Sequence, residues 1–243
     1  ASAIAANTKT YLVDHATGNG HFVPTSVPRE LKAQEIPGIV HAYVLAARNA
    51  VSSAGFDGVE IHAANGYLLE QFLKNGANKR TDDYGGSIEN RARLLLEVTR
   101  AVVDAIGGGK VGIRLSPVTP ANDIIDSHPQ PLYDYVAEQL APLGLAFVHV
   151  VEGATGGPRE VEGRPFDYAD FKNNYRKFGG KGAWMVNNGY DKALAEKAIE
   201  SGHADMVAFG KAFISNPDLV ERLKADAPLN AWDQSTFYGG GEK

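Results

Sequence analysis

Apolar residues recur along the chain with two periods, one typical of helices and one typical of short strands. Between residues 32 and 54, apolar positions follow one another at intervals of three and four, which predicts a helix that ends at Gly55. The stretch 58–62 is short and β-branched and predicts a strand. A long loop and then a helix over about 87–106 are expected to follow it.

The same order of strand and helix recurs in the rest of the chain. The predicted elements are strand 111–115, helix 132–140, strand 147–151, helix 168–178, strand 183–186, helix 192–201, strand 206–209 and a helix after Pro217. Strands that alternate with helices are typical of a parallel sheet. Residues 1–31 depart from this order, because they mix Thr, Gly, Asn and Pro around short β-prone pieces. They predict an irregular excursion or hairpin, turning at residues 18–20, that serves as a lid.

Polar residues at the strand ends favour a (β/α)8 barrel over an open, doubly wound sheet. In a barrel every strand contributes to one mouth, whereas an open sheet gathers ligands at a single switch point. Six residues lie at or just past the five predicted strand ends: His62, Arg114, Ser116, Glu152, Asn187 and Gly210. A closed barrel needs eight strands. Residues 1–243 are therefore expected to form one partial TIM-barrel domain of the α/β class that supplies roughly strands 4 to 8.

Composition and charge narrow the classes of function. The 243 residues are 44% hydrophobic, and 24 Lys and Arg against 29 Asp and Glu give a net charge of −5. These values exclude a disordered or fibrous chain and argue against a nucleic-acid or membrane partner. The absence of cysteine fits a reducing compartment, with the cytoplasm as the default. The seven histidines show no metal-ligand spacing, so we expect no metal site.

The motif that starts at His62 carries the clearest chemistry. His62 shares a strand face with Glu60, which is available to hold either His62 or Arg114. His62 and Asn65 offer hydrogen-bond donors that can stabilise an enolate, and Tyr67 offers a phenolic proton. This set predicts addition across a polarised double bond. An equally simple interpretation is a strand cap followed by a turn and a packed tyrosine.

A second group of residues follows the last two predicted strands. Asn188 and Gly189 come after strand 183–186, and Gly210 and Lys211 come after strand 206–209. Loops after the last two strands of a barrel commonly bind phosphate through backbone N–H groups and a cation. The sequence therefore predicts a phosphorylated ligand, with ordinary strand-to-helix turns as the alternative.

Two long motifs closely resemble the old yellow enzyme family of flavin ene-reductases. They are GFDGVEIHAANGYLL at 55–69 and NKRTDDYGGSIENR at 78–91, with shorter matches GIRLSP at 112–117, FGKAFISNPDL at 209–219 and TFY at 236–238. The resemblance covers nearly the whole chain. It implies a (β/α)8 barrel that binds FMN and uses NADPH or NADH to reduce small activated alkenes such as enones. Nitro compounds and nitrate esters are further implied substrates.

The resemblance also implies roles for individual residues. His62 and Asn65 would bind the carbonyl or nitro oxygen of the substrate, and Tyr67 would protonate its α-carbon. The residues implied to hold FMN are Arg114, Asn188, Gly189, Gly210, Lys211, Phe237 and Tyr238, the last of which would also contact the substrate. The position of Lys211 is usually Arg in the family, so a bidentate phosphate contact becomes a single point charge here.

The family's first three strands precede the region of resemblance, which implies a complementary N-terminal segment of the same barrel as a partner. Two other interpretations remain open from the residues alone. One is a flavin-free barrel isomerase or lyase that acts on a phosphorylated substrate with His62 and Tyr67. The other is a non-catalytic barrel fragment or assembly module whose open sheet edges pair with another chain. Bound flavin and molecular size distinguish these cases.

Overall fold

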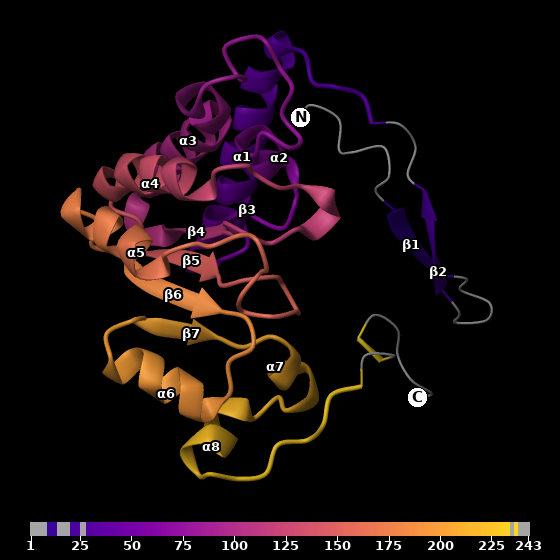
Figure 1. Cartoon of the computed structure of the whole chain (residues 1–243). Helices are drawn as coiled ribbons and strands as arrows, with labels where there is room; N and C mark the ends of the chain where they lie inside the picture. Colours follow the sequence, from indigo (N-terminus) through magenta and orange to yellow (C-terminus); the bar gives the residue numbers. More distant parts are fainter. Residues whose placement is uncertain (1–8, 14–19, 25–27, 234–235, 238–243) are drawn as a thin grey trace.

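A five-stranded parallel sheet in the order β3-β4-β5-β6-β7 forms the centre of the molecule (Figure 1). The computed structural model describes residues 9–13, 20–24, 28–233 and 236–237. A separate two-stranded antiparallel sheet is formed by β1 (Lys9–Val13) and β2 (Gly20–Pro24). Both the parallel sheet and the hairpin were expected from the sequence, while most of the predicted hairpin turn lies outside the described residues.

The elements alternate as the hydrophobic pattern predicts. The strands of the large sheet are β3 (Val59–Ala63), β4 (Val111–Leu115), β5 (Phe147–Val151), β6 (Ala183–Asn187) and β7 (Met206–Ala208). The helices are α1 (Ile36–Arg48), α2 (Leu68–Leu73), α3 (Ile88–Ile106), α4 (Pro129–Leu140), α5 (Tyr168–Lys177), α6 (Lys192–Glu200), α7 (Lys211–Ser215) and α8 (Leu219–Lys224). A π-helical segment, Asn49–Ser53, extends α1. The expectation of one long loop after β3 is wrong, because α2 occupies part of it.

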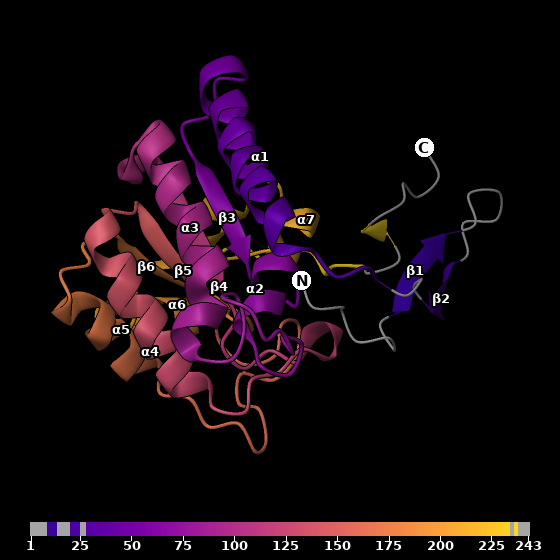
Figure 2. The ribbon, with the colours of Figure 1, turned by 90° about the horizontal axis from the view of Figure 1, so that it is seen from above.

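The strand register separates an apolar face from a polar face. Ile61, Ile113, Val148 and Trp184 stand side by side on four strands and are almost fully buried. The neighbouring helices α1, α3, α4 and α5 pack against one another in chain order along the sheet (Figure 2). One position further along, His62 pairs with Arg114, and Arg114 pairs with His149. We call His62, Arg114 and His149 the polar row; it lies on the face opposite the apolar row, because neighbouring residues of a strand point to opposite faces.

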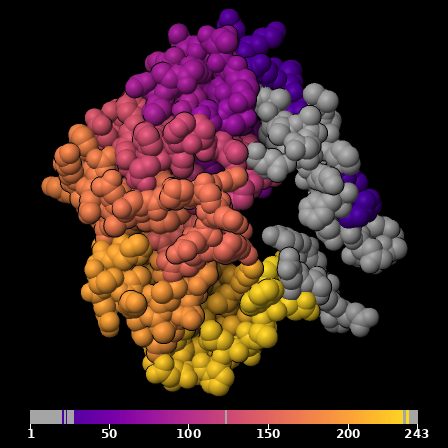
Figure 3. All heavy atoms as spheres, viewed as in Figure 1, coloured from indigo at the N-terminus to yellow at the C-terminus, as the bar shows by residue number. Residues whose placement is uncertain are grey.

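Strands β3 and β7 are the two edges of the large sheet, and each is paired on one side only within it. Figure 3 shows the segments in colour order across the body, so that residues near 40 and residues near 225 lie at opposite ends. A sheet that curves toward a barrel has open edges until further strands close it. The fold is thus the five-stranded part of a barrel, with its polar row on the side that a closed barrel would enclose.

Candidate active site

His62 and Tyr67 lie together where β3 ends and α2 begins. Their ring centroids are 5.2 Å apart and the rings are tilted by 49°. Burial lowers the pKa of the half-buried His62, and the charge of Arg114 lowers it further. The imidazole is therefore neutral at pH 7, so that one ring nitrogen donates and the other accepts. Tyr67 is 56% exposed.

Asn65 sits in a left-handed turn between these two residues. Its φ is +57°, a conformation that asparagine tolerates better than most residues. Its N–H donates to Ser116 Oγ at 2.8 Å, and its carbonyl accepts from Asn122 Nδ2 at 3.0 Å. Gly66 continues the turn at φ +76°, where a Cβ would lie 2.5 Å from the carbonyl oxygen of Ala121. The predicted turn therefore exists, and its backbone is fixed by Ser116 and Asn122.

A fully buried polar cluster supports this turn from below. We call Glu70, Lys74, Ser116 and Tyr133 the Glu70 cluster; all four have no exposed surface. Glu70 accepts from Gly66 N at 2.6 Å, Ser116 Oγ at 2.6 Å and Tyr133 OH at 3.0 Å, and pairs with Lys74 Nζ at 2.9 Å. Burial lowers the pKa of Lys74 and raises that of Tyr133.

Sequence reasoning missed the Glu70 cluster because the segment after Tyr67 was expected to be a loop. The sequence does contain a signal for a helix in this segment. Leu69, Phe72 and Leu73 lie at helical spacing, and Glu70 precedes Lys74 by four residues, which is the favourable order for an ion pair on a helix. The partners from β4 and α4 could not be found this way, because they are distant in the chain.

The four residues predicted to bind phosphate line one cavity of about 400 Å³. Gly189 follows β6 with φ +69°, and Gly210 and Lys211 lie at the start of α7. The Lys211 ammonium stands 4.7 Å from the centre of the Trp232 ring, and the Phe237 ring lies against the same ring, with centroids 5.8 Å apart and planes tilted by 50°. The structure thus brings Phe237 against Trp232, which lines this cavity, while Tyr238 lies outside the described residues.

Asn188 lines the cavity, but its side chain holds a loop. Its Nδ2 donates to the carbonyls of Glu152 at 2.6 Å and Ala154 at 2.9 Å, and its Oδ1 accepts from the Gly156 N–H at 3.0 Å. We call residues 152–157 the β5 loop. Asn188 therefore shapes the cavity by fixing the wall that the β5 loop forms.

Three buried polar atoms on the polar side of the sheet have no hydrogen-bond partner among the described residues: Arg114 Nε, His149 Nε2 and Asn187 Oδ1. Burial lowers the pKa of Arg114. The hydrogen bond of Glu60 goes to His149, whose Nδ1 lies 2.8 Å from Glu60 Oε2, while the charge of Glu60 acts to raise the pKa of Arg114 and of His62. Unpaired buried polar atoms are rare in folded proteins and commonly mark a ligand site. FMN has a ring system with acceptor atoms and a chain with hydroxyl groups. The donor of Arg114 fits the ring acceptors, and the acceptor of Asn187 fits the hydroxyl groups.

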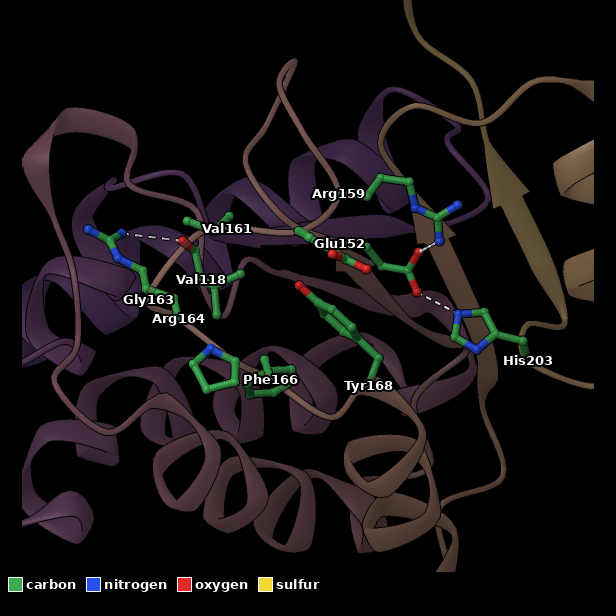
Figure 4. A pocket seen from close by; sticks show the side chains of 11 residues that line it. Val118, Glu152, Arg159, Val161, Gly163, Arg164, Phe166, Tyr168 and His203 are labelled. Carbon is green, nitrogen blue, oxygen red and sulfur yellow. Dashed lines mark hydrogen bonds and ion pairs between the residues drawn. The ribbon is translucent and has the colours of Figure 1, made fainter.

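A second buried carboxylate, that of Glu152, lies at the first residue of the β5 loop (Figure 4). Glu152 contacts Arg159, His203 and Tyr190 OH, the last at 2.6 Å. Burial raises the pKa of this carboxyl, but the hydrogen bonds from His203 and Tyr190 and the charge of Arg159 outweigh it and lower the pKa overall. Glu152, Arg159 and His203 border a cavity of about 710 Å³. Because the carboxylate is fully paired, its role here is to hold the loop.

No group of three or more His, Asp or Glu side chains in the described part of the chain lies close enough to hold a metal ion. No helix among the same described residues is long and apolar enough to cross a membrane.

The parallel sheet, its helix-covered face and the polar residues at the strand ends define a protein of the (β/α) barrel class. Residues 9–230 match the model of the NADH:flavin oxidoreductase / NADH oxidase family, and the chain belongs to this family. The resemblance to old yellow enzymes is thereby confirmed.

Individual relatives agree. A Leishmania infantum protein named as a probable flavin mononucleotide-dependent alkene reductase is 46% identical over 224 residues, 92% of this chain and 58% of its own. Morphinone reductase in complex with tetrahydroNAD is 43% identical with a TM-score of 0.85, covering 99% of this chain and 63% of that one. The old yellow enzyme homologue from Zymomonas mobilis is 38% identical with a TM-score of 0.84, covering 91% and 61%. The chain therefore spans about three fifths of the length of these relatives.

Proposed function

We propose that the chain forms the substrate- and phosphate-binding part of an FMN-dependent ene-reductase that takes hydride from NAD(P)H and reduces small activated alkenes. The observation that carries this proposal is the meeting of two sets of residues at the carboxyl ends of the strands. His62, Asn65 and Tyr67 lie on one side. The cavity of Gly189 and Lys211 lies on the other side, across the β5 loop.

His62 and Asn65 would bind the oxygen of the substrate. A neutral imidazole and a carboxamide both donate hydrogen bonds without adding a positive charge. Donors aimed at one carbonyl or nitro oxygen withdraw electrons from the conjugated double bond and stabilise the enolate-like charge that develops in the transition state. The lowered pKa of His62 supports this role, because the neutral form is already present at pH 7.

Tyr67 would hold the proton that the α-carbon receives. Its ring lies beside His62, and the residue is exposed. A phenol in hydrogen-bond reach of the reacting carbon can act as a general acid. The exposure of Tyr67 also allows the proton to be restored from solvent after each turnover.

FMN would be held by Arg114, Gly189, Gly210 and Lys211, with Asn188 shaping the wall and Phe237 and Tyr238 near the ring. The bound cofactor supplies the chemistry that no side chain has, the transfer of a hydride from the nicotinamide to the β-carbon of the alkene. The unpaired Nε of Arg114 and the positive φ of Gly189 support this assignment. Membership of a flavin oxidoreductase family disfavours the flavin-free isomerase or lyase.

The edges β3 and β7 would pair with the remaining strands of the barrel, which a complementary N-terminal segment supplies. The hairpin of β1 and β2 would act as a lid at the mouth. NADPH or NADH as reductant is supported by the relative solved with tetrahydroNAD.

The test is the visible absorption spectrum of the purified chain with FMN, alone and together with a segment that carries the remaining strands. We expect bound-flavin bands that bleach with NAD(P)H and recover with cyclohexenone. Size-exclusion chromatography of the same samples reports whether the two polypeptides associate. If no flavin binds in either sample, the proposed function is wrong and a non-catalytic assembly module becomes the better interpretation.

A further inference from the structure

The side chain of Asn65 is held by a short chain of hydroxyl groups from two other loops. Thr155 Oγ1, in the β5 loop, donates to Asn65 Oδ1 at 2.6 Å. Thr119 Oγ1 lies 3.4 Å from Thr155 Oγ1 and donates its own proton to the carbonyl of Gly153 at 2.6 Å. The Asn65 backbone is fixed separately by Ser116 and Asn122. The carboxamide therefore has one remaining freedom, which is the exchange of its oxygen and nitrogen ends.

The hydroxyl chain sets which end faces the mouth. A hydroxyl has a single proton to donate. With Oδ1 toward Thr155, that proton makes a short hydrogen bond. With Nδ2 toward Thr155, and with water excluded by a ligand in the mouth, the proton would have to go to Thr119, at a distance beyond the usual range for O–H···O bonds. The oxygen end is therefore drawn to Thr155, and the NH2 group of Asn65 is presented to a ligand.

We propose that Thr155 is a positioning residue that makes Asn65 a hydrogen-bond donor and so selects ligands that present an acceptor oxygen, such as a carbonyl, nitro or phenolate group, over ligands that present an amino group. This inference rests on the proposed function, since it concerns the residue that would bind the substrate oxygen. It goes further in naming a loop residue, distant in the chain from the His62 motif, as a determinant of ligand class.

The position of Thr155 explains why its effect depends on a ligand. Its side chain is exposed, so in water the bond to Asn65 competes with solvent. Thr155 also borders the cavity of Gly189 and Lys211, and the β5 loop that carries it is tied down by Asn188. A ligand in the mouth excludes water from this bond and strengthens it. The discrimination is therefore expected in binding and hardly at all in the stability of the free chain.

The test compares two probes of nearly equal shape, 4-chlorophenolate and 4-chloroaniline, by isothermal titration at a pH above the pKa of the phenol. The variants are Thr155→Val, which keeps the shape and removes the hydroxyl, and Thr155→Ser, which keeps the hydroxyl. Thr99→Val, a buried threonine of α3 whose hydroxyl donates to Leu95 O, is the matched control. The ratio of phenolate affinity to aniline affinity is measured for each protein, with FMN and without it.

We expect the ratio to fall about tenfold in Thr155→Val, the effect of one hydrogen bond, and to stay within about twofold of the parent in Thr155→Ser and Thr99→Val. General damage to the site would weaken both probes together and leave the ratio unchanged. An unchanged ratio in Thr155→Val, an equal fall in Thr155→Ser, or a parent chain that does not prefer the phenolate would each overturn the inference.

An NMR measurement on the FMN-free chain separates this inference from the proposed function. The side-chain carbonyl carbon of Asn65 is expected to move upfield in Thr155→Val, because it loses an accepted hydrogen bond, and to keep its position in Thr155→Ser. If it does not move, the Thr155 bond is not formed and the inference is wrong, whatever the flavin experiment gives. If it moves while no FMN binds, the proposed function alone has failed.

Discussion

The Glu70 cluster and the polar row of the sheet are neighbours, but they differ in whether their buried polar atoms have hydrogen-bond partners. In the Glu70 cluster every charged or hydroxyl group has a partner from the same chain. On the polar row, Arg114 Nε and His149 Nε2 are buried and have no partner in the part of the chain that the structure describes. The atoms concerned are buried in both regions, so the difference does not come from burial alone.

The difference separates scaffold from binding surface. A buried polar group without a hydrogen-bond partner destabilises the folded chain. Such a group is therefore expected where a bound ligand supplies the partner. The Glu70 cluster is complete and holds the turn of Asn65 in one conformation. The polar row is incomplete within the described residues and is available to a ligand. Substitutions in the first region should therefore lower stability, and substitutions in the second should lower binding.

The largest effect is expected from Lys74→Met, which removes the buried counterion of Glu70. Breaking a buried ion pair from one side is expected to reduce the free energy of unfolding by about 3–5 kcal/mol. Urea denaturation measures it, with Lys79→Met on an exposed lysine as the control, expected within about 0.5 kcal/mol of the parent. A loss below about 1 kcal/mol for Lys74→Met would mean that the Glu70 cluster does not stabilise the turn of Asn65.

Tyr67→Phe is expected to separate catalysis from both stability and binding. Loss of the general acid should slow alkene reduction about 100-fold, while bleaching of the flavin by NAD(P)H and the free energy of unfolding stay the same. Stopped-flow absorbance measures the two half-reactions on the assembled, FMN-loaded protein. Tyr135→Phe on α4 is the control. Equal slowing of both half-reactions would argue that Tyr67 shapes the mouth and does not deliver the proton.

Arg114→Met tests the polar row directly. We expect FMN affinity to fall about tenfold or more, because a charge-assisted hydrogen bond is lost. The FMN-free chain should be no less stable than the parent, since a buried charge with an unpaired Nε is removed. Quenching of flavin fluorescence gives the affinity and urea denaturation gives the stability. A large loss of stability with unchanged FMN affinity would mean that Arg114 stabilises the fold and does not bind FMN. The distinction between the Glu70 cluster and the polar row would then be wrong.

The smallest effect is the pH dependence that His62 contributes. Its pKa in the folded chain lies below the ordinary value of 6.5, so the unfolded chain binds the proton first as the pH falls. The stability that this residue contributes is therefore complete above about pH 6.5 and is lost as the pH falls toward the folded-state pKa, with a slope of less than about 1.4 kcal/mol per pH unit. His62→Gln should flatten the stability profile in this window. Identical profiles for both proteins would contradict a buried, neutral His62.

The order of strands and helices was predictable because each element carries its own period of apolar residues. Strands β4 and β5 have the predicted bounds, and α3 ends one residue before Gly107, which has a positive φ. The residues of the mouth were also predictable, since they follow directly from strand ends in a parallel sheet. Helix α2 was missed because six residues are too few for the period to be clear beside a polar loop.

The sequence by itself determined the period of each element, the polar residues at its end and the long motifs that mark the family. Tertiary structure decided which of these residues act together. It paired Glu60 with His149 where the sequence suggested His62 or Arg114, and it used Asn188 to hold a loop. It also brought Thr155 to Asn65 across 90 positions. The physical reason is that hydrogen-bond partners are chosen by distance in space, which the fold sets and a local pattern does not contain.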